Sequence, residues 1–146
     1  MKKEITYFET IKENHTLETF EIVEQKLKET GIKKVVLAST TGRTALVAME
    51  FFSGKGVTLV VIPHQYGFSD EENRFPQSVV ESLRNNGHEV HFGTMLFHTE
   101  RLYGSSIPNV IADFLRCFSE GVKVCIEITL MAADGGLVKN GASVIA

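Results

Sequence analysis

Tryptophan is absent from this chain, and cysteine occurs only twice, at Cys117 and Cys125. Two cysteines in apolar surroundings argue against the disulfide framework of a small secreted domain. A chain of 146 residues buries roughly 68–70% of its unfolded surface, so folding needs no disulfide or metal. We therefore expect a single domain over residues 1–146, in the cytoplasm.

Long apolar runs and excess positive charge are also missing. No run approaches the roughly 20 residues that span a bilayer, and residues 1–6 lack the apolar core of a signal peptide. The net charge of -3 gives no indication of a nucleic-acid partner. None of the histidines has the spacing of a helical zinc motif. We expect no membrane, nucleic-acid or metal partner.

Short apolar segments alternate with helical patterns along the chain. Buried strands are predicted at 34–38 and 57–62 and a less apolar strand at 89–92. Helices are predicted from Leu17 up to Gly31 (with Asn14 or Thr16 as N-cap) and at 44–52, 76–86 and 107–118. Alternation at 122–128 predicts another strand, followed by a glycine-rich loop at 134–136 and a terminal apolar segment at 143–146. Residues 1–13 either form an edge strand or pack onto the body. This order predicts an α/β three-layer sandwich with a mainly parallel sheet.

The sharpest local signal is the loop that follows the first buried strand. Its residues are Ser39, Thr40, Thr41, Gly42, Arg43 and Thr44. The glycine lets a backbone approach a ligand without a Cβ, and the first-turn N–H groups of the next helix attract an anion. We predict a phosphate-binding loop, although the hydroxyls could instead only cap the helix. The sequence contains no P-loop and no G-x-G-x-x-G motif.

Other polar candidates lie in segments expected at the same sheet edge. Ligands in such sheets bind beyond the carboxyl ends of the strands, so we expect loops 39–43, 63–74, 93–106 and 129–136 to meet there. His64, Gly67 and Phe68 follow the second strand, where an aromatic ring can stack on a planar ligand or simply plug the core. Glu127 and Asp134 form a carboxylate pair suited to acid–base work or hydroxyl binding, or else bond loop backbone.

Residues 35–62, with the loop at 39–45 inside them, resemble the C-terminal α/β domain of pyruvate kinase, in which a Ser/Thr-rich turn holds a sugar-phosphate effector. The chain is more similar to a stand-alone family called pyruvate kinase C-terminal-domain-like, through segments 7–9, 13–16, 38–45, 64–69 and 121–136. This resemblance implies a flavin mononucleotide (FMN) or similar phosphorylated ligand and no pyruvate kinase activity. Family members continue past the position of Ala146, so we expect a pocket that is incomplete or completed by another subunit.

Three functional hypotheses follow. The first is a small-molecule binding domain for FMN or a sugar phosphate. The second is an enzyme that uses FMN or a phosphorylated metabolite, with Glu127, Asp134 or His64 as acid–base groups. The third is a homo-oligomer-forming module whose terminal apolar segment pairs with a neighbouring chain.

Overall fold

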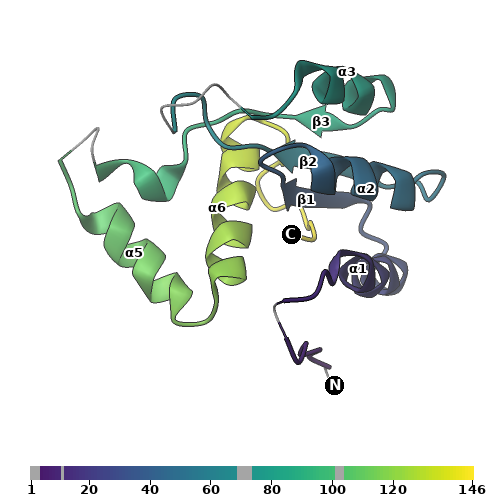
Figure 1. Cartoon of the computed structure of the whole chain (residues 1–146), viewed down its shortest axis with the longest axis horizontal. Helices are drawn as coiled ribbons and strands as arrows, with labels where there is room; N and C mark the ends of the chain where they lie inside the picture. The colour runs from purple at the N-terminus through teal and green to yellow at the C-terminus, as the bar shows by residue number, and fades with distance from the viewer. Residues whose placement is uncertain (1–3, 11, 69–73, 101–103) are drawn as a thin grey trace.

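The structure, a computed structural model, describes residues 4–10, 12–68, 74–100 and 104–146 (Figure 1). Its helices and strands confirm an α/β domain. In chain order they are α1 (Thr16–Thr30), β1 (Lys34–Ala38), α2 (Arg43–Phe51), β2 (Thr58–Ile62), α3 (Gln77–Asn85), β3 (Glu89–Val90), the 3-10 helix η1 (Leu96–His98), α5 (Ile107–Arg116) and α6 (Glu120–Asp134).

The sheet has the order β1-β2-β3 and is parallel throughout. Val36 is paired with Val60, and Val60 in turn with Glu89. Strands β1 and β2 are runs of branched apolar residues, as expected for strands covered on both faces. The third strand is shorter than the predicted 89–92. All three strands end at the same edge of the sheet.

Helices cover both faces of this sheet, which confirms the three-layer arrangement. On one face, Val35, Leu37, Leu59 and Val61 pack with buried residues of α1, α2 and α3. On the other face, Val36, Val60 and Ile62 pack with Met95 and with the α6 residues Ile128, Met131 and Ala132. Successive residues of each strand therefore pack alternately into the two hydrophobic cores. Helix α5 packs on α6 and η1, farther from the sheet (Figure 1).

The strand predicted at 122–128 is wrong, because these residues belong to α6. Ser119 caps the helix: its Oγ accepts a hydrogen bond from the Val122 amide at 3.0 Å. The apolar residues here alternate with a period of two, as in a strand. Val124 and Ile128 are also four residues apart, so in a helix they share the face that packs against the sheet. The loop expected at 129–136 is wrong for the same reason, since α6 runs on to Asp134.

The two ends of the chain also differ from expectation. Residues 4–10 and 12–15 form no strand; Tyr7 is exposed, and the Phe8 ring stacks on His15 at 4.2 Å. The N-cap of α1 is His15 rather than Asn14 or Thr16. At the other end, the Ile145 carbonyl accepts a hydrogen bond from the Val36 amide at 2.8 Å. The terminal segment therefore pairs with β1 of its own chain. Among the helices of the described residues, none has the length and apolar character to cross a membrane.

Candidate functional site

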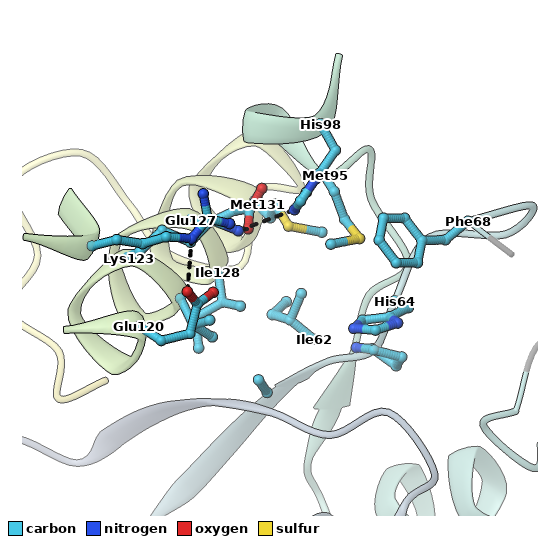
Figure 2. A pocket seen from close by; sticks show the side chains of 14 residues that line it. Ile62, His64, Phe68, Met95, His98, Glu120, Lys123, Glu127, Ile128 and Met131 are labelled. Atoms are coloured by element: carbon cyan, nitrogen blue, oxygen red, sulfur yellow. Dashed lines mark hydrogen bonds and ion pairs between the residues drawn. The ribbon is translucent and has the colours of Figure 1, made fainter. Parts of the chain in front are cut away.

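A cavity of about 260 Å³ lies beyond the carboxyl ends of β1 and β2, where they face α6 and η1. Its apolar wall includes Ile62, Met95, Ile128 and Met131. Its polar wall comes from separate segments: His64 follows β2, His98 ends η1, and Lys123 and Glu127 lie on α6. Figure 2 shows the α6 side chains facing His64 and Phe68 across this cavity. The position is the one at which parallel α/β sheets bind ligands.

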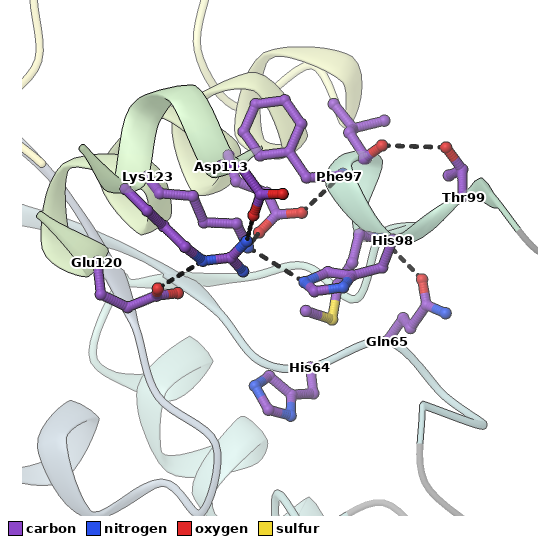
Figure 3. Close-up of polar contacts among 12 residues, drawn as sticks. His64, Gln65, Phe97, His98, Thr99, Asp113, Glu120 and Lys123 are labelled. Carbon is purple, nitrogen blue, oxygen red and sulfur yellow. Dashed lines mark hydrogen bonds and ion pairs between the residues drawn. The ribbon is translucent and has the colours of Figure 1, made fainter. Parts of the chain in front are cut away.

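A lysine buried in the cavity wall makes the strongest polar contacts. The Lys123 Nζ atom lies 2.5 Å from Oε2 of Glu127 and 3.1 Å from Nε2 of His98 (Figure 3). It also lies 5.7 Å from the centroid of the Phe97 ring. Positions 123 and 127 are one helical turn apart, so α6 itself brings the two charges together. A buried lysine side chain needs partners of this kind, because an unpaired charge removed from water is costly.

These contacts indicate which atoms of each side chain donate and which accept hydrogen bonds. Glu127 accepts from Lys123 with Oε2 and from the Phe97 amide with Oε1 at 2.9 Å, so both oxygens are engaged. An ammonium can only donate, so Nε2 of His98 accepts and the ring is assigned the neutral Nδ1–H tautomer. Burial and the Lys123 charge lower the pKa of His98 below its ordinary 6.5, in agreement with a neutral ring. Among the described residues, two partners accept from the Lys123 ammonium, which leaves one of its three N–H groups.

His64 connects the cavity to the loop after β1. Its Nε2 lies 3.5 Å from Oγ1 of Thr40. Burial is the main cause that lowers the pKa of His64 from 6.5, and the positive charge of Arg74 acts in the same direction. Phe68 lies between the two histidines, with its ring centroid 4.8 Å from His64 and 5.3 Å from His98. Phe68 therefore lines the cavity, with its ring still 42% exposed, and does not plug the core.

The loop at 39–44 borders this cavity without lining it. Ser39 is buried and caps α2, because its Oγ accepts from the Ala45 amide at 3.3 Å. Gly42 has φ of 84°, and a Cβ there would lie 3.2 Å from the Val79 methyl groups. Backbone conformation and packing against α3 are therefore each a reason for a glycine at this position.

The rest of the loop keeps the features of an anion site. Thr41 and Arg43 are exposed. Within the part of the chain that the structure describes, the Arg43 and Thr44 amides have no hydrogen-bond acceptor. They open α2, where the helix dipole favours negative charge.

Besides the loop at 39–44, two further predicted site residues do not line the cavity. Asp134 is exposed at the last position of α6, seven residues and so roughly 10 Å along the axis from Glu127. The adjoining Leu137 carbonyl accepts from Lys34, at the start of β1, so Asp134 lies toward the opposite edge of the sheet. The predicted carboxylate pair does not form. Gly67 is exposed with φ of 72° and does not line the cavity.

Several cavity residues were not predicted from the sequence. Besides Lys123 and His98, they include Arg116 and Glu120, which are joined by a hydrogen bond of 2.7 Å from Nε to Oε2. The signal for Lys123 was its spacing of four from Glu127, which is meaningful only once the segment is read as a helix. His98 had no local signal, because η1 is short and aperiodic.

No protein-family model matches the chain. Among the residues that the structure describes, no group of three or more His, Cys, Asp or Glu is placed to hold a metal ion. The chemistry of the site therefore has to be argued from its own side chains. A buried ammonium, two histidines and an apolar wall are suited to binding a small molecule with anionic or carbonyl oxygen atoms.

Proposed function

We propose that this protein is a small-molecule binding domain that holds a phosphorylated organic ligand at the carboxyl edge of its sheet. The observation that carries this proposal is the contact between Thr40 and His64 at 3.5 Å, which places the start of α2 beside the cavity. One ligand can therefore reach both features. The phosphate is placed at the amides of Arg43 and Thr44, and the organic part enters the cavity.

The cavity chemistry supports an oxygen-rich organic part. The third N–H of Lys123 is available for a ligand oxygen, while Ile62 and Met95 provide an apolar floor. A charge-assisted bond from a buried ammonium is stronger than one between neutral groups. Binding is preferred to acid–base catalysis because both oxygens of Glu127 are already engaged.

The size of the cavity favours a compact ligand. At about 260 Å³ it lies just below the roughly 300–1,000 Å³ of sites that enclose drug-sized molecules. A sugar phosphate fits this space with its phosphate outside, at the loop. FMN, the other candidate, would extend beyond the cavity over the exposed ring of Phe68. A sugar phosphate is therefore our first candidate and FMN the second.

Isothermal titration calorimetry with ribose 5-phosphate, FMN and inorganic phosphate tests this proposal. We expect ribose 5-phosphate or FMN to bind more tightly than inorganic phosphate. The exposed guanidinium of Arg43 would add a charge-assisted bond to a phosphate at these amides. Arg43→Ala should therefore weaken that binding about tenfold. The control is Arg84→Ala, because Arg84 is exposed at the end of α3, next to the opposite edge of the sheet. Equal losses in both variants, or no binding of any probe, would overturn the proposal.

The absorbance spectrum of the purified protein distinguishes the two ligands. Flavin absorbance that co-purifies with the protein favours FMN, whereas a colourless protein that binds ribose 5-phosphate favours the sugar phosphate. Replacing Gly42 is unsuitable as a binding test, since an added Cβ would meet Val79 and change the packing of α3.

A further inference from the structure

Helix α5 has an apolar stripe that nothing in the described chain covers. Four of its residues recur at the spacing of one helix face, and the fifth lies in the turn just after the helix: Ile107, Val110, Ile111, Phe114 and Phe118. Their exposed fractions are high for large apolar side chains, reaching 63% at Phe114 and 69% at Phe118. A helix of a globular domain normally turns such a stripe toward the core.

The residues on the opposite side of α5 explain why the apolar stripe faces outward rather than toward the core. Ala112 is the buried residue of the helix. Near it, the Asn109 side-chain amide, oriented to donate, reaches the Phe97 carbonyl at 3.3 Å and the Glu100 carboxylate at 3.2 Å. The inward side of α5 therefore carries Ala112, the polar contacts of Asn109 and the partly buried Leu115, whereas Ile107, Val110, Ile111 and Phe114 are exposed. Helix α5 also lies on the outside of α6, away from the sheet (Figure 1).

The exposed area of the stripe can be compared with the area that protein interfaces bury. The exposed fractions of its residues correspond to roughly 600 Å², the upper limit of the largest apolar patch on a typical monomer. Two such stripes facing each other would bury at most about 1,200 Å², which is where stable protein interfaces begin.

We propose that the α5 stripe is the interface of a homodimer, in which α5 of one chain packs antiparallel against α5 of a second copy. A stripe of only apolar side chains is self-complementary, as a two-fold interface requires. The neighbouring charges do not favour a partner of opposite sign, because Arg116 is already bonded to Asp113 and Glu120. Strand pairing at β1 is the other route to self-association, and Ile145 of the same chain already pairs with Val35 at that edge.

Size-exclusion chromatography with light scattering tests the proposal directly. We expect the wild-type protein to have twice the chain mass of 16.2 kDa at micromolar concentration. Phe114→Lys should raise the dissociation constant roughly 30-fold or more, as expected for loss of a central aromatic contact. The control is Leu17→Lys on α1, a residue that is exposed to a similar degree but lies on another helix. A monomeric wild-type protein, or a dimer that Phe114→Lys leaves intact, would overturn the proposal.

Site-specific cross-linking covers the case in which Phe114→Lys does not fold. Ile111→Cys, in a background with both native cysteines replaced by serine, places one thiol near the middle of the stripe. A short bismaleimide should join two chains through this thiol, and the same background with Leu17→Cys should give no covalent dimer. The reverse result would contradict an α5 interface. Neither experiment involves the ligand, so its outcome is independent of the proposed function.

Discussion

Lys123 and Glu127 form an ion pair across one turn of α6, with side chains only 3% and 4% exposed. Two charges removed from water to this extent are tolerated only when each has further partners. Here His98 accepts from the lysine, and the Phe97 amide donates to the carboxylate. The pair thus joins α6 to η1 and fixes the polar wall of the cavity.

Lys123→Met is expected to destabilise the protein by about 3–5 kcal/mol, because Glu127 would be left as an uncompensated buried charge. Replacing both residues, as Lys123→Met with Glu127→Leu, should restore most of this loss. Urea unfolding followed by circular dichroism measures both effects. The control is Lys28→Met, which removes a lysine paired with Glu24 on the exposed side of α1 and should change stability little. A similar small loss for Lys123→Met would mean that the ion pair is solvated.

Gly42→Ala should cost more stability than Gly54→Ala. Both glycines have positive φ, of 84° and 71°, so both substitutions impose a backbone strain of roughly 1–2 kcal/mol. Only at Gly42 would the new methyl also contact Val79, whereas a Cβ at Gly54 has open space. Thermal unfolding of the two variants gives the difference. Val79→Ala should reduce the additional cost of Gly42→Ala, and equal costs for the two glycines would contradict the close contact.

Much of the fold was predictable because its signals are local. The β1 and β2 strands are uniform apolar runs. Helices α2, α3 and α5 are flanked by glycine or proline residues, which break helices. The period of α6 was ambiguous: Val122, Val124, Ile126 and Ile128 alternate, yet the same residues fit a helix. The Ser119 cap was the local signal that could have decided between them.

The candidate site was only partly predictable, because it depends on long-range placement. Loop 39–44 and His64 follow directly from the parallel topology. The position of His64 across the cavity from Lys123 and His98 depends on how α6 and η1 pack, and that packing involves sequence-distant residues such as Met95 and Ile128. Asp134 was placed at the site only because α6 had been read as a strand and a loop.

Stability is expected to fall as the pH is lowered from about 7 to 5.5. Burial lowers the pKa of His88 and His98 from 6.5, so below pH 6.5 the unfolded chain binds more protons than the folded chain. Both rings also act as acceptors, His88 from the Leu59 amide and His98 from Lys123. Urea unfolding at pH 7.5, 6.5 and 5.5 measures the slope, which His88→Gln and His98→Gln should each reduce. A pH-independent stability over this window would contradict neutral, accepting histidines.

Ser39 and Thr40 are adjacent in the sequence, but substitutions at them should have different effects. We expect the change at Ser39 to lower stability and the change at Thr40 to weaken ligand binding. Ser39→Ala removes the cap on the Ala45 amide and should cost about 1 kcal/mol of stability, within the range measured for helix caps. It should leave the affinity for ribose 5-phosphate or FMN unchanged, because the hydroxyl is buried and already accepts a bond. Thr40→Val keeps the side-chain shape but removes the hydroxyl near His64. It should weaken ligand binding while leaving the urea midpoint unchanged, and the opposite pattern would mean that the ligand contacts the loop through Ser39.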